Sequence, residues 1–89
     1  MLSAAERKQL KARAHRLEPV VLIGTKGLTD DVVKEVDLAL KAHGLIKVRA
    51  PELEREARED ALKALCERTG AESVQAIGKV FVIYRKRDE

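Results

Sequence analysis

The sequence predicts an α+β domain in which helices pack on a mixed four-stranded sheet, in the order α-β-α-β-α-β-β. Segments with helical spacing of apolar residues alternate with short runs rich in Val and Ile. A strand–helix–strand crossover places the first two strands parallel, whereas the last two runs are separated only by Gly78 and Lys79 and predict an antiparallel hairpin. At 89 residues, 45% apolar and 2% aromatic, the chain fits one domain with an aliphatic core.

The first helix is expected over residues 3–17. Ser3 is a good N-cap, and Glu6 stands at the position that completes a capping box. Leu10, Ala14 and Leu17 form a narrow apolar stripe at i, i+4 and i+7. The proline at position 19 forbids continuation, so the helix ends before it.

The next two elements are a strand over residues 20–23 and a helix that follows residue 29. The strand is an unbroken apolar run, which is typical of a strand buried on both faces. Thr29 is a suitable N-cap for the helix, with Asp30 and Asp31 in its first turn. Gly44 stands where a left-handed C-terminal cap is expected.

Residues 45–50 alternate, so that Ile46, Val48 and Ala50 share one face and Lys47 and Arg49 the other. This pattern predicts a strand with one packed and one open face. A third helix is expected over residues 53–69, closed by a glycine. Its inward residues are predicted to be Ala57, Ala61, Leu62, Leu65 and Cys66. Residues 73–77 and 80–84 are the last two strands, in which Tyr84 is expected to be part of the core.

The sequence argues against an enzyme, a metal protein and a membrane protein. The two histidines lie on different predicted helices, and Cys66 is the lone cysteine. No His/Cys cluster has zinc spacing, and no apolar run approaches the ~20 residues that cross a membrane. The N-terminus lacks the apolar region of a signal peptide. We therefore expect a cytoplasmic protein with no cofactor, no catalytic residues and no small-molecule substrate.

Charge is distributed unevenly, although the net charge is only +3. Residues 1–17 contain five basic residues and one acid, and residues 78–87 contain four basic residues and no acid. Residues 51–60 contain five acids and two arginines. If the two ends meet in space, one basic and one acidic surface would result, but solvated faces of this kind are also common.

The segment Gly24-Thr25-Lys26-Gly27 lies between the first strand and the second helix. Two positions without Cβ let a backbone approach a ligand closely, a helix N-terminus favours anions, and Lys26 adds a full charge. A GxxG loop is what the KH fold uses to clamp a nucleic-acid backbone. The alternative is an ordinary tight turn with an exposed lysine. The segment is not a nucleotide P-loop, because Gly27 is followed by leucine.

Other basic residues allow two interpretations as well. Lys47 and Arg49 on the second strand and Arg85 after the last strand could contact phosphates or could form a solvated edge that discourages strand pairing.

Three blocks of the sequence resemble the bacterial YhbY-like proteins, which are stand-alone CRM domains (chloroplast RNA splicing and ribosome maturation). The blocks are residues 10–29, residues 43–48, and Ile77-Gly78-Lys79 with Val82-Ile83-Tyr84-Arg85. They occur in the family's order, so the resemblance is far more specific than the GxxG loop alone. It identifies residues 1–87 as a single CRM-type RNA-binding domain followed by terminal residues 88–89.

The resemblance implies a fold similar to the C-terminal domain of bacterial translation initiation factor three. It also implies a protein that binds RNA, namely large-subunit ribosomal RNA in a ribosome precursor, and assists assembly of that subunit. The residues that it and the basic pattern assign to RNA binding are Gly24, Thr25, Lys26, Gly27, Lys8, Lys11, His15, Lys47, Arg49 and Arg85. The alternative is a protein–protein adaptor on the ribosome that acts through the acidic third helix.

Overall fold

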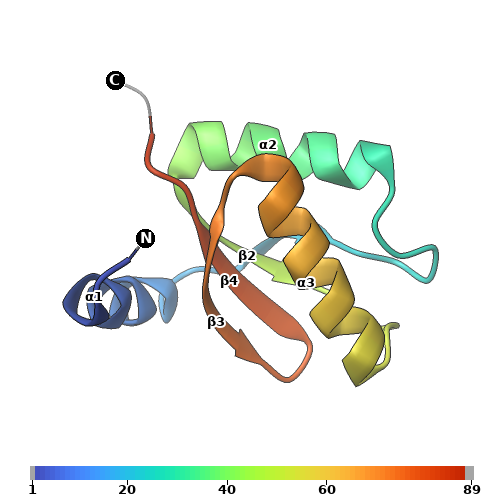
Figure 1. The fold of residues 1–89 in the computed structure, drawn as a ribbon, viewed down its shortest axis with the longest axis horizontal. Helices are drawn as coiled ribbons and strands as arrows, with labels where there is room; N and C mark the ends of the chain where they lie inside the picture. The colour runs from blue at the N-terminus through green and yellow to red at the C-terminus, as the bar shows by residue number, and fades with distance from the viewer. Residues whose placement is uncertain (1, 88–89) are drawn as a thin grey trace.

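A computed structural model describes residues 2–87 of the chain, and terminal residues 88–89 lie outside the described part. It contains three helices and four strands in the predicted α-β-α-β-α-β-β order (Figure 1). The helices are α1 (Ala4–Ala14), α2 (Asp30–His43) and α3 (Arg55–Thr69). The strands are β1 (Pro19–Leu22), β2 (Leu45–Arg49), β3 (Glu72–Ile77) and β4 (Val80–Tyr84). None of the helices in residues 2–87 combines the length and apolar character that a bilayer span requires.

The four strands form one mixed sheet in the order β1-β2-β4-β3. Strands β1 and β2 are parallel, as the crossover through α2 predicts, and the two remaining neighbour pairs are antiparallel. Helices α2 and α3 cover one face of the sheet, and α1 lies against part of the other face (Figure 1). The predicted α+β class and mixed sheet are therefore confirmed.

Two hydrophobic clusters hold these layers together. The larger cluster joins α2 and α3 to the sheet through side chains such as Leu40, Leu65, Ile46 and Phe81, all nearly or fully buried. The smaller cluster places Leu10 and Ala14 of α1 against the opposite face, and Tyr84 packs partly buried at its margin. Because β2 and β4 contribute alternate residues to the two clusters, they are covered on both faces along part of their length.

Local sequence signals set the helix ends. Ser3 and Glu6 form the predicted capping box, and the Thr29 hydroxyl accepts a hydrogen bond from the backbone N–H of Val32. Gly44 ends α2 with φ +76°, a conformation that an L side chain adopts at a cost. Helix α1 is shorter than predicted, because its last regular residue is Ala14 and residues 15 and 16 continue only as a turn.

Two burial predictions are wrong. Strand β1 is not buried on both faces, since Val21 is buried whereas Val20 and Leu22 are 51% and 59% exposed. The physical reason is that β1 is an edge strand and α1 contacts the other three strands instead. Ala57 is exposed rather than inward, because α3 begins at Arg55 and its first turn projects beyond the larger cluster.

Candidate nucleic-acid interface

The Gly24–Gly27 loop is a tight turn in which the backbone N–H of Gly27 donates to the carbonyl of Gly24 at 3.0 Å. Thr25 and Lys26 occupy the two central positions, and both are exposed. Gly27 has φ +74°, whereas Gly24 has no positive φ. A Cβ added at either glycine would meet no atom within 4 Å. Gly27 is therefore required by the backbone conformation, and nothing inside the protein requires a glycine at position 24.

The N-terminus of α2 is less available to an anion than the sequence indicates. Thr29 already caps it, and two carboxylates, Asp30 and Asp31, are exposed in its first turn. Asp30 accepts a hydrogen bond from Arg68 at 2.8 Å, and this bond lowers the pKa of Asp30 below its usual range. The carboxylate is thus charged at neutral pH and offsets the positive end of the helix dipole. Phosphate contact at this loop would come from turn backbone N–H groups and Lys26.

The uncovered half of the sheet presents a row of side chains that runs across all four strands. Leu22 pairs with Arg49, Arg49 with Val80, and Val80 with Ile77. Opposed residues in a sheet point to the same side, so these four side chains share one face. Leu22, Arg49 and Ile77 are exposed and Val80 is partly exposed. We call this row the open sheet face; its Leu22 end lies two residues before Gly24.

A groove of about 210 Å³ lies between the C-terminal turn of α1 and the sheet. Lys11 and His15 border it from the helix, and Lys47 borders it from β2. Its apolar lining includes Ile77 and Val80, so the groove continues into the open sheet face. Fold topology thus brings together basic residues that are 32 to 36 positions apart in the sequence.

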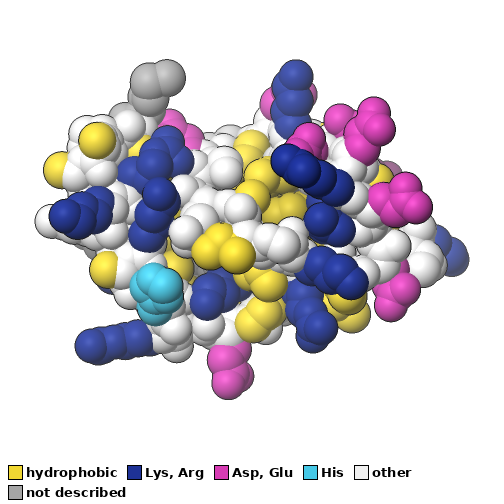
Figure 2. Space-filling view, turned by 90° about the horizontal axis from the view of Figure 1, so that it is seen from below, with side chains coloured by type: hydrophobic (Ala, Val, Ile, Leu, Met, Phe, Trp, Pro, Cys, Tyr) yellow, Lys and Arg dark blue, Asp and Glu magenta, His cyan; other side chains and the backbone are white. Residues whose placement is uncertain are grey.

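The basic residues near the open sheet face and the loop have no acidic partners in the described part of the chain, unlike several basic residues on the side of α2 and α3. Within residues 2–87, no hydrogen bond or ion pair engages the side chains of Lys11, Lys26, Lys47 or Arg49. The cations that are paired with acids come instead from α2, α3 and the C-terminal segment. Figure 2 shows this face, with hydrophobic side chains in the centre, Lys and Arg side chains around them, and acidic side chains mainly toward one end. Unpaired cations around an apolar centre favour a polyanionic ligand.

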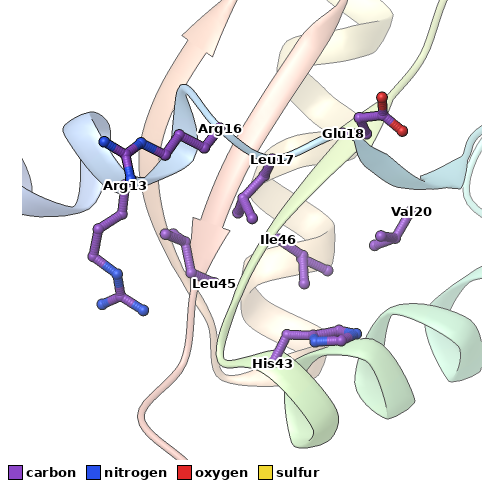
Figure 3. Close-up of a pocket in the computed structure, with 8 residues that line it drawn as sticks. All are labelled: Arg13, Arg16, Leu17, Glu18, Val20, His43, Leu45 and Ile46. Carbon is purple, nitrogen blue, oxygen red and sulfur yellow. The ribbon is translucent and has the colours of Figure 1, made fainter.

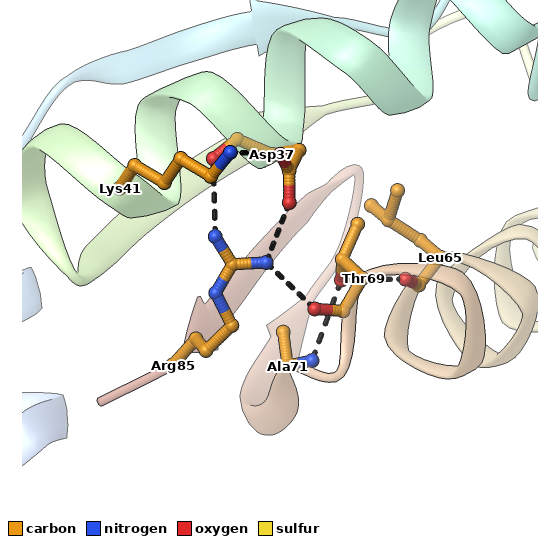
Figure 4. Close-up of polar contacts among 6 residues, drawn as sticks. All are labelled: Asp37, Lys41, Leu65, Thr69, Ala71 and Arg85. Carbon is orange, nitrogen blue, oxygen red and sulfur yellow. Dashed lines mark hydrogen bonds and ion pairs between the residues drawn. The ribbon is translucent and has the colours of Figure 1, made fainter. Parts of the chain in front are cut away.

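Arg85 is placed differently from the other predicted contacts. Its guanidinium donates to the Asp37 carboxylate and to the Thr69 carbonyl, each at 2.7 Å (Figure 4). The side chain is 22% exposed, and it joins the middle of α2 to the end of α3. The bond from Arg85, with a second from Lys41, lowers the pKa of Asp37. Arg85 is therefore engaged within the fold. Lys8, another of the predicted RNA contacts, lies on α1 one turn before Lys11.

Sequence reasoning missed residues of two kinds. The apolar members of the open sheet face were not predicted, because a run of four apolar residues looks the same in a half-exposed strand and in a buried one. Arg13, Arg16 and His43 were not proposed as site residues, yet they border a hollow of about 530 Å³ floored by Leu17, Leu45 and Ile46 (Figure 3). The basic density of residues 1–17 was the available signal, but the proximity of His43 depends on the fold.

Side chains suited to metal binding do not assemble in the described part of the chain. No three His, Cys, Asp or Glu side chains in residues 2–87 gather as metal ligands. Cys66 is half-buried, and burial raises the pKa of its thiol, which keeps it protonated and weakly nucleophilic.

The comparison with protein families decides the identity of this fold. The model of the CRS1/YhbY (CRM) domain matches residues 2–85. The chain belongs to this family. An RNA-binding protein of Haemophilus influenzae is 41% identical over 88 residues, which cover 99% of this chain and 89% of that protein. A Pseudomonas aeruginosa protein named as a probable RNA-binding protein is 40% identical over 85 residues, covering 96% and 82% of the two chains.

A solved structure agrees with the architecture. The solution structure of a hypothetical protein from Staphylococcus aureus, described as a candidate RNA-binding protein, superposes with a TM-score of 0.87. It is 32% identical, and the match covers 100% of this chain and 93% of the other. The resemblance to the YhbY-like proteins is therefore confirmed, and so is the α+β fold with its mixed four-stranded sheet. The likeness to the C-terminal domain of translation initiation factor three stays a prediction.

Proposed function

We propose that this CRM domain is a non-enzymatic RNA-binding protein. The observation that carries the proposal is the surface of unpaired cations formed by Lys11, Lys47 and Arg49, with Lys26 at the tip of the loop beyond β1. The names of the relatives from Haemophilus influenzae and Pseudomonas aeruginosa support RNA as the ligand. Lys8 and His15 extend this surface along α1.

The loop and the basic surface have different roles in the proposed contact. At Gly24 the absence of a side chain lets a sugar–phosphate backbone approach the turn, and Lys26 neutralises a phosphate there. The cations on α1 and β2 neutralise further phosphates and fix the orientation of the RNA. With few aromatic residues, the domain has little capacity for base stacking on rings, so RNA shape supplies most of the specificity.

The proposed target is ribosomal RNA in a precursor of the large subunit, where the domain assists assembly. The resemblance to the YhbY-like proteins supports this target. Crosslinking in cells followed by sequencing of the attached RNA is expected to recover large-subunit ribosomal RNA. In solution, neutralisation of about four to six phosphates predicts that log K falls with log salt at a slope of about −3 to −5. Recovery of messenger or transfer RNA would contradict the proposed target. Binding that does not depend on salt would contradict the proposed phosphate contacts.

The two glycines of the loop offer a test that separates RNA contact from folding. Gly24→Ala is expected to leave the melting temperature unchanged, because its Cβ meets no protein atom and its φ is not positive. It should weaken RNA binding about threefold to tenfold, because the Cβ points into space that the RNA backbone is proposed to use. Gly27→Ala is the matched variant. It should cost about 1 kcal/mol of stability, because alanine is strained at φ +74°. Calorimetry and fluorescence anisotropy measure both effects, and unchanged RNA affinity in Gly24→Ala would remove this glycine from the interface.

A second candidate function is that of an adaptor for a basic protein on the ribosome. The observation that favours it is the exposure of acidic residues at the start of α3, namely Glu52, Glu54, Glu56, Glu59 and Asp60. If this surface is the main contact, the substitutions Glu56→Lys and Glu59→Lys should abolish ribosome association while binding to naked RNA persists. Under the RNA-binding proposal, association should survive these substitutions.

A further inference from the structure

The open sheet face combines exposed aliphatic side chains with a cation in its centre. Leu22 and Ile77 are each 59% exposed, and they stand at opposite edges of a sheet whose other face packs against α2 and α3. Between them lie Arg49 on β2 and Val80 on β4, in direct cross-strand register. Helix α1 covers the neighbouring part of this face through Leu10 and Ala14 and leaves this row uncovered. The row is therefore an apolar platform with a guanidinium in its middle.

Charge indicates what kind of ligand fits this platform. Arg49 has no acidic partner in residues 2–87. Lys47, which borders the adjoining groove, has no acidic partner in those residues either. A polyanion that also carries flat apolar groups satisfies both features at once. Unpaired RNA has this chemistry, because its bases can lie on an apolar or guanidinium surface while its phosphates meet neighbouring cations. A base-paired helix instead hides its bases and would leave the aliphatic row uncovered.

Dimensions and position favour the same ligand. Neighbouring strands lie about 4.8 Å apart, so the row from β1 to β3 spans roughly 14 Å. Sheets of RNA-recognition domains hold about two or three bases on a comparable surface. The row begins at Leu22, two residues before the Gly24 turn, and ends beside the groove that Lys11 borders. A strand leaving a double helix near the turn would thus cross the open sheet face toward α1.

We infer that the open sheet face binds two or three unpaired nucleotides, so that the domain recognises a junction between double-stranded and single-stranded RNA. Arg49 stacks on one base, and Leu22, Val80 and Ile77 contact the others. This inference rests on the proposed RNA-binding function and adds the class of RNA that the surface selects.

The test compares two RNA hairpins that are identical except for a three-nucleotide single-stranded extension on one of them. The extension is expected to raise the affinity of the natural protein about tenfold. Shared among two or three bases, this gain is smaller per base than the contribution of a base stacked on an aromatic ring. Leu22→Ala with Ile77→Ala should remove most of this gain and leave the affinity for the blunt hairpin unchanged. Both side chains are exposed, so the fold should be retained, which a thermal melt verifies.

A gain-of-function variant completes the test, because misfolding cannot produce it. Ile77→Tyr places an aromatic ring on the platform and should tighten binding of the extended hairpin severalfold without affecting the blunt one. Equal affinity of the natural protein for both hairpins, or a full gain from the extension in the double alanine variant, would overturn the inference. In either case the proposed function survives if the blunt hairpin still binds with strong salt dependence. Failure to bind either hairpin at low salt would instead contradict the proposed function itself.

Discussion

Removing three cations from the sheet and α1 is expected to lower RNA affinity on the order of 100-fold at low salt, taking about 1 kcal/mol for each lost charged contact. The substitutions are Lys11→Ala, Lys47→Ala and Arg49→Ala. All three side chains lack ionic partners in the described residues, so their removal breaks no ion pair within the fold. The slope of log K against log salt should become shallower by about 2 to 3, since each phosphate contact contributes about 0.7–0.9. Lys26→Ala alone should change the slope by about one.

A triple variant on the opposite side provides the matched control. Lys34, Lys41 and Lys63 are exposed on α2 and α3, which cover the other face of the sheet. Replacing these three by alanine changes the net charge equally but should alter the affinity by no more than about threefold, through long-range electrostatics. Equal losses in the two triple variants would mean that RNA responds to net charge alone. The basic surface would then lose its status as an interface.

Local signals made most of the fold predictable. Ser3 with Glu6, Thr29 and Gly44 mark helix ends through short-range hydrogen bonds and backbone preferences that a sequence displays directly. The failure at β1 has a different origin. Four consecutive apolar residues indicate a strand, but the position of α1 determines which faces of that strand are covered. Leu22 is exposed because α1 lies over β2, β3 and β4, and this placement is a tertiary property.

The candidate site was predictable in its charges but not in its geometry. Alternation showed that Lys47 and Arg49 share an open face, and Lys11 and His15 are four positions apart, a spacing that puts two residues on one side of a helix. That these two pairs border one groove follows only from the packing of α1 on the sheet. The carboxylates beside the loop were visible in the sequence as helix-capping residues. Asp30 and Asp31 stabilise α2 because they lie at the positive end of its dipole, and from the same positions they oppose phosphate binding there.

Arg85 was predicted as an RNA contact from the basic pattern of the sequence, but in the structure its side chain stabilises the fold. Arg85→Ala is expected to lower the melting temperature by about 10 °C. Its bond to the Thr69 carbonyl is of a type worth about 1.5–3 kcal/mol, and about 1 kcal/mol shifts the melting temperature of a small domain by about 4–8 °C. RNA affinity measured well below the melting transition should stay within about twofold. Lys86→Ala is the matched control, since Lys86 is exposed and has no polar partner in residues 2–87.

Two further measurements distinguish a structural role of Arg85 from a role in RNA contact, namely the Arg85→Lys variant and the pH dependence of the melting temperature. Arg85→Lys keeps the charge but cannot serve two acceptors through one planar group, so it should remain destabilised. A phosphate contact that depends on charge alone would be restored by lysine. Because Arg85 lowers the pKa of Asp37, the ion pair stabilises the protein above the ordinary carboxyl pKa of about 4 and is lost as the pH falls through the lowered value. The difference in melting temperature between the natural protein and Arg85→Ala should therefore narrow in acid. A difference that is independent of pH would mean that the bond to the Thr69 carbonyl, and not the ion pair with Asp37, carries the stabilisation. A loss of RNA affinity with an unchanged melt would return Arg85 to the interface that the sequence proposed.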